Sequence, residues 1–116
     1  MGQAADAWDK FRSMMERGEF DEITEVYSPD TLFLEPFNPP HRGNLLTQAY
    51  LKDYFSEKAN IAVDEAKRIE AADGKTIAIE WALSYDAAGR RWNNLPRATF
   101  LEVDEHGQIA VQRDYS

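Results

Sequence analysis

Two carboxylates in this sequence are placed where they could exchange protons with a bound molecule. Glu35 follows the short apolar run 31–34 and precedes Pro36, and Asp114 lies within Arg113-Asp114-Tyr115. A carboxylate enclosed by apolar side chains is poorly solvated, and this raises its pKa. A raised pKa suits a general acid or base that works near neutral pH. We therefore predict that Glu35 and Asp114 act as an acid–base pair on a ring-bearing apolar substrate.

The same two carboxylates also permit a structural interpretation. Because side chains alternate along a strand, Glu35 is expected on the face of Phe33, and Asp114 on the face opposite Arg113 and Tyr115. Glu35 could nevertheless lie at the rim of the fold, solvated or bonded to loop amides, while Asp114 pairs with an arginine. The sequence leaves both interpretations open.

Other catalytic signatures do not occur in the sequence. It has no Cys, and its two histidines, His41 and His106, lie far apart without a clustered third ligand. This excludes thiolate chemistry and gives no metal signature. A phosphate-binding glycine loop, a Gly-x-Ser-x-Gly elbow and a dinucleotide fingerprint are missing too. We therefore expect neither a metal nor a cofactor.

Composition bounds the size and the partners of the protein. The chain has 116 residues, 43% of them hydrophobic, which is enough for one core, so we expect a single domain over residues 1–116. Its formal charge of −8 opposes binding to nucleic acid and to anionic membranes. No apolar run approaches the ~20 residues of a membrane span. The N-terminus lacks the pattern of an export signal, so we expect a cytoplasmic protein.

Apolar spacing predicts helices in the first half of the chain. An amphipathic helix is expected over residues 4–17, ended by Gly18, and a shorter one from Asp21 to Tyr27. Residues 31–35 indicate a strand, and three prolines and a glycine between 36 and 43 argue against regular structure in 37–43. The stripe of the first helix consists of Ala4, Trp8, Phe11 and Met15.

A third helix and four strands are expected in the rest of the chain. Asn44 is expected to cap a helix to about Lys58 that buries one apolar face. After residue 61 the apolar period changes from helical to two, which indicates antiparallel strands with a hairpin at Asp73-Gly74. Helices that precede a run of strands indicate an α+β fold with helices on one face of a curved sheet. The expected helix face is Leu46, Ala49, Tyr50 and Tyr54, with Leu51 and Phe55 alongside. The strands carry Ile61, Val63 and Ile69, then Ile77, Ile79, Trp81, Leu83 and Tyr85, then Phe100 to Val103, then Ile109 to Tyr115.

The order of these segments resembles the nuclear transport factor 2-like superfamily. Nearly the whole chain is similar to the branch that holds SnoaL-like polyketide cyclases, ketosteroid isomerase and limonene-epoxide hydrolase. The resemblance implies a cone-shaped, curved antiparallel or mixed sheet wrapped around a long N-terminal helix. It also implies an open end that admits a small apolar molecule, and a homodimer through the outer sheet face. The residues that carry it are Arg17-Gly18-Glu19-Phe20-Asp21, Tyr27-Ser28-Pro29-Asp30, Glu35-Pro36, His41-Arg42-Gly43 and Arg113-Asp114-Tyr115.

The resemblance to particular enzymes is partial. Glu35 stands where ketosteroid isomerases have their base, but the positions of their two oxyanion donors correspond to Phe11 and Ala98. Losing one such donor costs roughly 2.7–4 kcal/mol, so steroid isomerisation is not expected. Of the five residues used by limonene-epoxide hydrolases only Asp114 matches, so epoxide hydrolysis is not expected either. SnoaL-like cyclases, which also use a late acidic residue, are closest in character.

We therefore predict a pocket between the first helix and the sheet, for which two functions remain. One is a cofactor-independent enzyme of isomerase, cyclase, dehydratase or hydrolase type that acts on a small hydrophobic molecule. The other is a noncatalytic module of the same fold that binds a small molecule or dimerises. Convergence of both carboxylates on one cavity would favour the enzyme, and a cavity filled by Trp81 and Met15 the module. The predicted lining is Trp8, Phe11, Met15, Phe33, Tyr54, Trp81, Leu83, Ala98 and Phe100.

Overall fold

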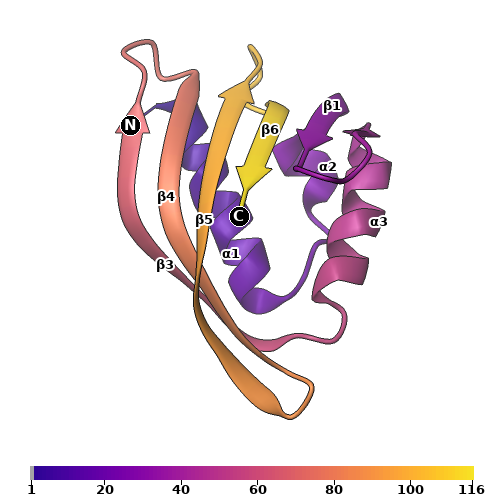
Figure 1. Ribbon diagram of the computed structural model, residues 1–116. Helices are drawn as coiled ribbons and strands as arrows, with labels where there is room; N and C mark the ends of the chain where they lie inside the picture. Colours follow the sequence, from indigo (N-terminus) through magenta and orange to yellow (C-terminus); the bar gives the residue numbers. More distant parts are fainter. Residues whose placement is uncertain (1) are drawn as a thin grey trace.

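The computed structural model describes residues 2–116, and this part of the chain holds three helices and one six-stranded sheet (Figure 1). Along the chain the elements are α1 (Gln3–Arg17), α2 (Ile23–Val26), β1 (Tyr27–Leu34), β2 (His41–Arg42), α3 (Asn44–Phe55), β3 (Ala59–Glu70), β4 (Thr76–Ala87), β5 (Arg90–Val103) and β6 (Ile109–Tyr115).

Helix α1 forms where the apolar stripe predicts it, and the stripe is the face that it buries. Trp8, Phe11 and Met15 are almost completely enclosed. Gly18 ends the helix in the left-handed conformation, with φ of 67°. Its N–H and that of Glu19 bond the carbonyls of Met15 and Met14, so the last turn keeps its hydrogen bonds.

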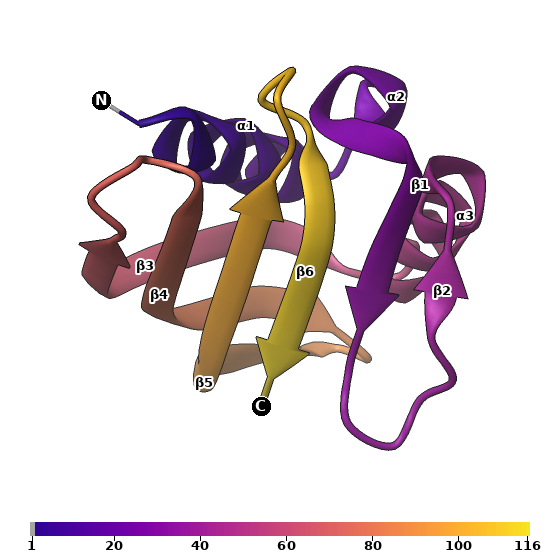
Figure 2. The same cartoon turned by 90° about the horizontal axis from the view of Figure 1, so that it is seen from above.

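The sheet has the strand order β2-β1-β6-β5-β4-β3 and curves around α1 (Figures 1 and 2). All neighbouring strands are antiparallel except β1 and β6, which run parallel. Figure 2 shows β6 between β1 and β5, which places the chain's last strand inside the sheet. The fold is thus the expected α+β arrangement of an N-terminal helix and a curved mixed sheet.

Strict alternation on β4 builds the inner face of the sheet. Ile77, Ile79, Trp81 and Leu83 are all buried, as their period of two predicts. The indole rings of Trp81 and Trp8 lie 5.6 Å apart, so β4 packs directly on α1. Buried residues of one strand and one helix therefore form the centre of the core.

Irregular pairing changes one predicted strand face. By alternation Ile69 would share the inner face of Val63, but Ile69 is 60% exposed. The register of β3 against β4 shifts between Glu65 and Lys67, which adds a residue to one strand. Such a bulge moves every later side chain to the other face, and the pattern of apolar residues does not reveal it.

The boundaries of the segments around β1 differ from expectation. Helix α2 is only Ile23–Val26, and Asp21 does not cap it. Tyr27 already belongs to β1, and the strand continues through Ser28-Pro29-Asp30 with an irregular register against β6. Within the proline-rich segment, His41 and Arg42 pair with β1 as a short edge strand, where prolines before it cost no central hydrogen bond.

The predicted buried face of α3 is wrong at two positions. Tyr50 and Tyr54 pack partly buried against the core, as expected, and Leu51 and Phe55 beside them are buried. Leu46 is 57% exposed and Ala49 is exposed, whereas Thr47 is buried. Apolar residues occupy more than one side of this helix, so the sequence does not select its buried side. Packing selects it, because the ring of Phe55 stacks on that of Phe20 at 5.3 Å. The helix also starts after Gly43 rather than at a capping Asn44, and it ends before Lys58.

Candidate active site

Glu35 and Asp114 line one cavity at the open end of the curved sheet. The cavity has a volume of about 140 Å³, and it continues inward as a space of only about 20 Å³. Both carboxylates border both parts, as do Tyr50, Tyr54 and Arg97. The structure therefore brings together residues from the end of β1, from α3, from β5 and from β6. The outer part is lined by Glu35, Pro36, Asn38, Tyr50, Tyr54, Arg97, Asp114, Tyr115 and Ser116.

Asp114 is fixed in this cavity through one of its carboxylate oxygens. Its Oδ1 accepts hydrogen bonds from Thr99 Oγ1 at 2.9 Å and from Gln112 Nε2 at 3.1 Å. Within residues 2–116 no hydrogen bond reaches Oδ2. The side chain is thus oriented by its neighbours, and one oxygen remains available for a proton.

A second layer of hydrogen bonds orients the two donors. Trp81 Nε1 donates to Thr99 Oγ1 at 2.9 Å, so the Thr99 hydroxyl proton is directed toward Asp114. The Tyr27 hydroxyl donates to Gln112 Oε1, which leaves the amide nitrogen of Gln112 for the carboxylate. All four supporting side chains are buried. Asp114 therefore belongs to a connected network in the core.

The surroundings of Asp114 give it the pKa of a group that titrates near neutral pH. Only 8% of the residue is exposed. Burial raises the pKa of Asp114 from 3.8 to about 6, against the opposing effects of the Gln112 and Thr99 hydrogen bonds. The negative charge of Glu35 adds to the rise, and the positive charge of Arg97 reduces it. No ion pair joins Asp114 to an arginine in the described part of the chain, so the partner that the structural interpretation expected is not the one that holds this residue.

Glu35 lies at the mouth of the cavity and is half-buried. The Tyr50 hydroxyl donates to its Oε1, and Asn38 Nδ2 donates to the same oxygen at 3.2 Å. Burial, followed by this bond to Glu35, raises the pKa of the Tyr50 phenol, so Tyr50 is a neutral donor. Each interpretation of Glu35 from the sequence therefore holds in part. The residue lines the cavity, and polar partners hold it at the rim.

The structure places six of the predicted lining residues at the inner part of the cavity and three elsewhere. Trp8 is buried behind the cavity, and its Nε1 donates to Glu65 at 2.9 Å. Ala98 and Phe100 lie on the outer face of the sheet, where they border a shallow groove. The six inner residues are Phe11, Met15, Phe33, Tyr54, Trp81 and Leu83.

Sequence reasoning missed Arg97, Tyr50, Thr99 and Gln112 as members of the site. A signal for Arg97 and Thr99 was present in β5. Leu101 is buried and so marks the inward face of the strand, and alternation places Thr99 and Arg97 on that same face. Tyr50 and Gln112 carried no comparable signal, since their roles depend on which face of α3 packs inward and on the β1–β6 pairing.

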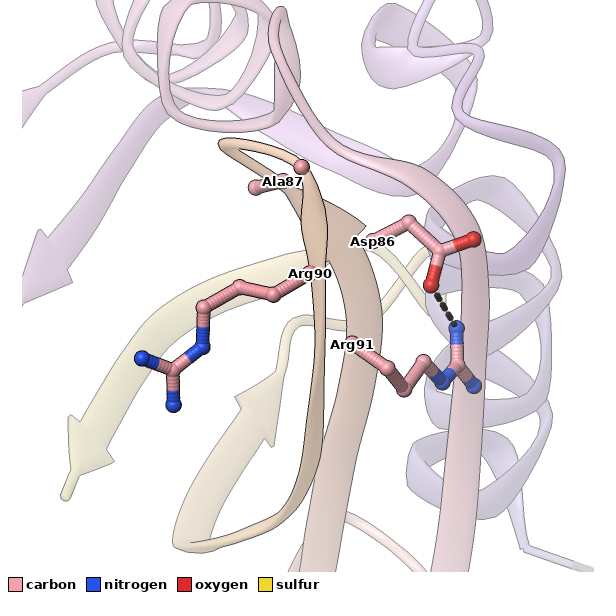
Figure 3. Close-up of a pocket in the computed structure, with 5 residues that line it drawn as sticks. Asp86, Ala87, Arg90 and Arg91 are labelled. Atoms are coloured by element: carbon pink, nitrogen blue, oxygen red, sulfur yellow. Dashed lines mark hydrogen bonds and ion pairs between the residues drawn. The ribbon is translucent and has the colours of Figure 1, made fainter.

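A larger hollow lies at the tip of the β4–β5 hairpin and has a different character (Figure 3). It spans about 500 Å³ between Asp86, Ala87 and the residues after the turn. Arg91 forms an ion pair with Asp86 at 3.3 Å, and Arg90 extends away from that pair, with its guanidinium 4.0 Å from the centre of the Trp92 ring. The hollow therefore lacks the enclosed, convergent side chains of the Glu35–Asp114 cavity.

Between residues 2 and 116, no group of three or more His, Cys, Asp or Glu side chains is arranged to hold a metal ion. No helix in this range is long and apolar enough to cross a membrane.

Comparisons with known proteins identify relatives of this arrangement. The model of the SnoaL-like domain family matches residues 8–112. A comparison with curated proteins gave no match. Among solved structures, a steroid delta-isomerase from Pseudomonas aeruginosa superposes with a TM-score of 0.74 at 18% identity, over 99% of this chain and 80% of that one.

Two other solved structures share the fold at similarly low identity. An epoxide hydrolase from M. tuberculosis, similar to limonene-epoxide hydrolase, has a TM-score of 0.77 at 21% identity, over 97% of this chain and 81% of its own. The epoxide hydrolase/cyclase-like enzyme SalBIII, which acts in pyran ring formation in salinomycin, has a TM-score of 0.81 at 14% identity, over 97% and 89%. These similarities concern the fold, which hosts several different reactions.

Proposed function

The chain belongs to the SnoaL-like domain family, and we propose that it is a cofactor-independent enzyme in which Asp114 and Glu35 move protons on a small, largely apolar molecule. The observation that carries this proposal is the shared cavity of the two carboxylates, with Asp114 held through Oδ1 and available at Oδ2. Solved structures with the same fold support the proposed type of reaction, because they include a steroid delta-isomerase, an epoxide hydrolase and an epoxide hydrolase/cyclase-like enzyme.

In the proposed reaction Asp114 acts first. With a pKa of about 6 it is mostly ionised at neutral pH, and Oδ2 takes a proton from a substrate carbon whose electron pair stays on the substrate. The proton returns to another atom of the substrate from Asp114, or exchanges with solvent through Glu35 at the mouth. A positioned acid–base group of this kind contributes roughly 10²–10⁴-fold to the rate.

Hydrogen–deuterium exchange tests the proposal without knowledge of the physiological substrate. The protein is incubated in D₂O with small cyclic ketones and keto acids, and loss of their α-protons is followed by NMR. We expect exchange to fall roughly 10²–10⁴-fold in Asp114→Asn. Its rate in the unchanged protein should rise with pH through about 6, because Asp114 must be ionised to act as a base.

Asp86→Asn is the matched control, because it makes the same change on an exposed carboxylate at the hairpin tip. It should leave the exchange rate unchanged. Exchange that continues at the original rate in Asp114→Asn would contradict the proposed role of this residue.

One observation favours the noncatalytic alternative. Phe11, Met15 and Trp81 fill most of the cone, so the inner space measures only about 20 Å³ and the outer part about 140 Å³. Ligand sites usually measure roughly 300–1,000 Å³. A cavity of about 150 Å³ nevertheless admits benzene in another protein. The volume thus limits the ligand to about one ring, whether it is converted or only bound.

We also propose that the protein forms a homodimer through the outer face of the sheet. Ile69 and Phe100 are 60% and 42% exposed there, and Ala78 and Ala98 lie beside them along a groove of about 280 Å³. Clustered apolar side chains on an exposed sheet face are typical of a protein interface.

A further inference from the structure

Arg97 is a cation in the cavity wall that has no anionic partner. It borders both parts of the cavity together with Glu35 and Asp114. Its Nη2 donates to the Tyr54 hydroxyl oxygen, and its Nε is buried without a hydrogen-bond partner. Within residues 2–116 its guanidinium forms no ion pair, whereas Arg12, Arg68 and other arginines of the surface do. A buried donor without an acceptor costs folding free energy, so this one calls for an explanation.

Tyr54 extends the excess of donors. Its oxygen accepts from Arg97, and no acceptor for its own hydroxyl proton occurs in the described part of the chain. The guanidinium and the phenol together therefore present several N–H and O–H groups to the cavity and no free acceptor. What the pair lacks is an oxygen, and a ligand could supply it.

Positive charge also accumulates behind Tyr54. Lys58 Nζ lies 4.0 Å from the centre of the Tyr54 ring, and the Arg97 guanidinium carbon lies 5.7 Å from it. Burial and the like charge of Arg97 lower the pKa of Lys58. Glu57 and Asp53 act on Lys58 in the opposite direction, so Arg97 is the cation that faces the cavity itself.

We propose that Arg97 and Tyr54 form a subsite for a carboxylate group of the substrate, so that the site takes a small cyclic monocarboxylic acid. The inference rests on the proposed function and names its substrate class. A guanidinium matches a carboxylate with two parallel hydrogen bonds, and the two Nη atoms of Arg97 carry the N–H groups that would form them beside the Tyr54 hydroxyl. The ring of such an acid would contact Phe33 and Trp81 in the inner part of the cavity.

The two carboxylates of the cavity oppose a bound anion, but neither of them takes up the Arg97 guanidinium. Glu35 accepts from Tyr50 and Asn38, and Asp114 accepts from Thr99 and Gln112, so both have their own donors and Arg97 stays available to a ligand. Hydrogen bonds from a guanidinium to a carboxylate are then expected to favour an acid over its amide by roughly tenfold to a hundredfold in Kd.

Equilibrium binding of benzoate and benzamide tests the subsite. The two probes share their ring and nearly their shape, and only benzoate carries charge. Binding is measured by titration calorimetry on the full chain, up to about 10 mM probe. We expect the unchanged protein to bind benzoate at least roughly tenfold more tightly than benzamide. Equal affinity, a preference for benzamide, or no benzoate binding would overturn the proposal.

Variants then assign the preference to Arg97. Arg97→Met should remove the preference for benzoate, while Arg97→Lys, which keeps the charge without the fork, should retain part of it. Arg90→Met is the matched control, since it removes a guanidinium from the same strand outside the cavity, and it should leave both affinities unchanged. A full preference in Arg97→Met, with a cooperative thermal transition showing that the variant is folded, would overturn the proposal.

The test is independent of catalysis. Asp114→Asn removes the proposed base but keeps Arg97, so it should lose exchange activity and still prefer benzoate. Loss of activity with no benzoate preference in any protein would leave the proposed function standing and reject the subsite. A benzoate preference together with unchanged exchange in Asp114→Asn would support the subsite and reject the proposed function.

Discussion

Asp114 combines a fixed position with an unfavourable charge. Its Oδ1 accepts from Thr99 and Gln112, while burial opposes ionisation of the group and raises its pKa to about 6. The folded protein therefore holds this carboxylate in place at a cost that the unfolded chain, with an ordinary pKa near 3.8, does not have. Such a cost at a cavity is typical of functional groups rather than of groups that stabilise a fold.

Replacing Asp114 by Asn should therefore stabilise the protein at alkaline pH. A raised folded-state pKa means that the folded state binds the proton more tightly, so stability falls as pH rises from about 4 to about 6. The difference from 3.8 to about 6 corresponds to ~3 kcal/mol, an upper estimate because Asn changes the donor pattern. We expect Asp114→Asn to raise the free energy of unfolding at pH 8 by ~1–3 kcal/mol.

Urea denaturation at pH 8 and at pH 4 measures this effect. At pH 4 the Asp114 side chain is largely protonated in the folded protein, so the variant and the unchanged protein should differ little. Thr99→Val, which removes a donor to the carboxylate, should instead destabilise the protein at pH 8. The assigned pKa would be contradicted if the stability of Asp114→Asn minus that of the unchanged protein were smaller at pH 8 than at pH 4.

The residues of the site were predictable to different degrees. Glu35 and Asp114 were predicted because they stand where enzymes of the resembling families carry functional carboxylates, and alternation indicated their faces; their catalytic role stays a prediction. Ala98 and Phe100 were assigned to the wrong face, although Leu101 in the same strand marks the inner one. Arg97 was missed for the same reason, because placing Ala98 and Phe100 on the inner face puts Arg97 on the outer face by alternation.

At the scale of elements, the buried faces of α1 and β4 follow from the sequence, and the buried face of α3 does not. A single apolar stripe gives α1 one side to bury, and strict alternation gives β4 one inner face. Helix α3 has apolar residues on several sides, so its packing against Phe20 and β1 decides which are buried. The bulge in β3 that exposes Ile69 likewise depends on pairing with β4.

The end of α1 offers a test of the rule that a glycine in the left-handed conformation ends a helix. Gly18 has φ of 67°, and a Cβ added there would meet only the Cδ1 atom of Ile61 at 3.9 Å, an ordinary contact. The cost of Gly18→Ala should thus be that of the left-handed backbone alone, about 1 kcal/mol in the free energy of unfolding.

Urea denaturation of Gly18→Ala and Gly18→Asn measures that cost. Asn tolerates the left-handed conformation better than Ala does, so Gly18→Asn should lose less stability. An equal loss in both variants, or none in Gly18→Ala, would show that the conformation of this residue does not control the end of the helix.

For the whole molecule, the order of elements was sufficient for the fold class. Helices that precede a meander of strands allow few arrangements, and the resemblance to one superfamily selected among them. The size of the cavity was beyond the sequence, because it depends on how closely Trp81, Met15 and Phe11 pack. Side-chain packing of this kind is decided by tertiary geometry rather than by pattern.

The apolar groove on the outer face of the sheet predicts that the whole molecule is a homodimer. We expect the protein to have twice the mass of the 13.3 kDa chain in light scattering coupled to size-exclusion chromatography. Phe100→Glu should convert it to the monomer, because a charge at the centre of an apolar interface would be desolvated. Leu45→Glu, at an exposed position of α3, is the control and should leave the mass unchanged. A monomeric parent protein would contradict the proposed interface.

The parallel pairing of β1 with β6 has a consequence for how a nascent chain acquires this structure. Leu32 is paired with Val111, so β1 and the helices beside it have no partner within the main sheet until residues 109–115 have been synthesised. Contacts between such distant segments form late and slowly. During synthesis the meander β3–β5 can assemble first, and the insertion of β6 then joins both halves and brings Asp114 opposite Glu35 in a single step.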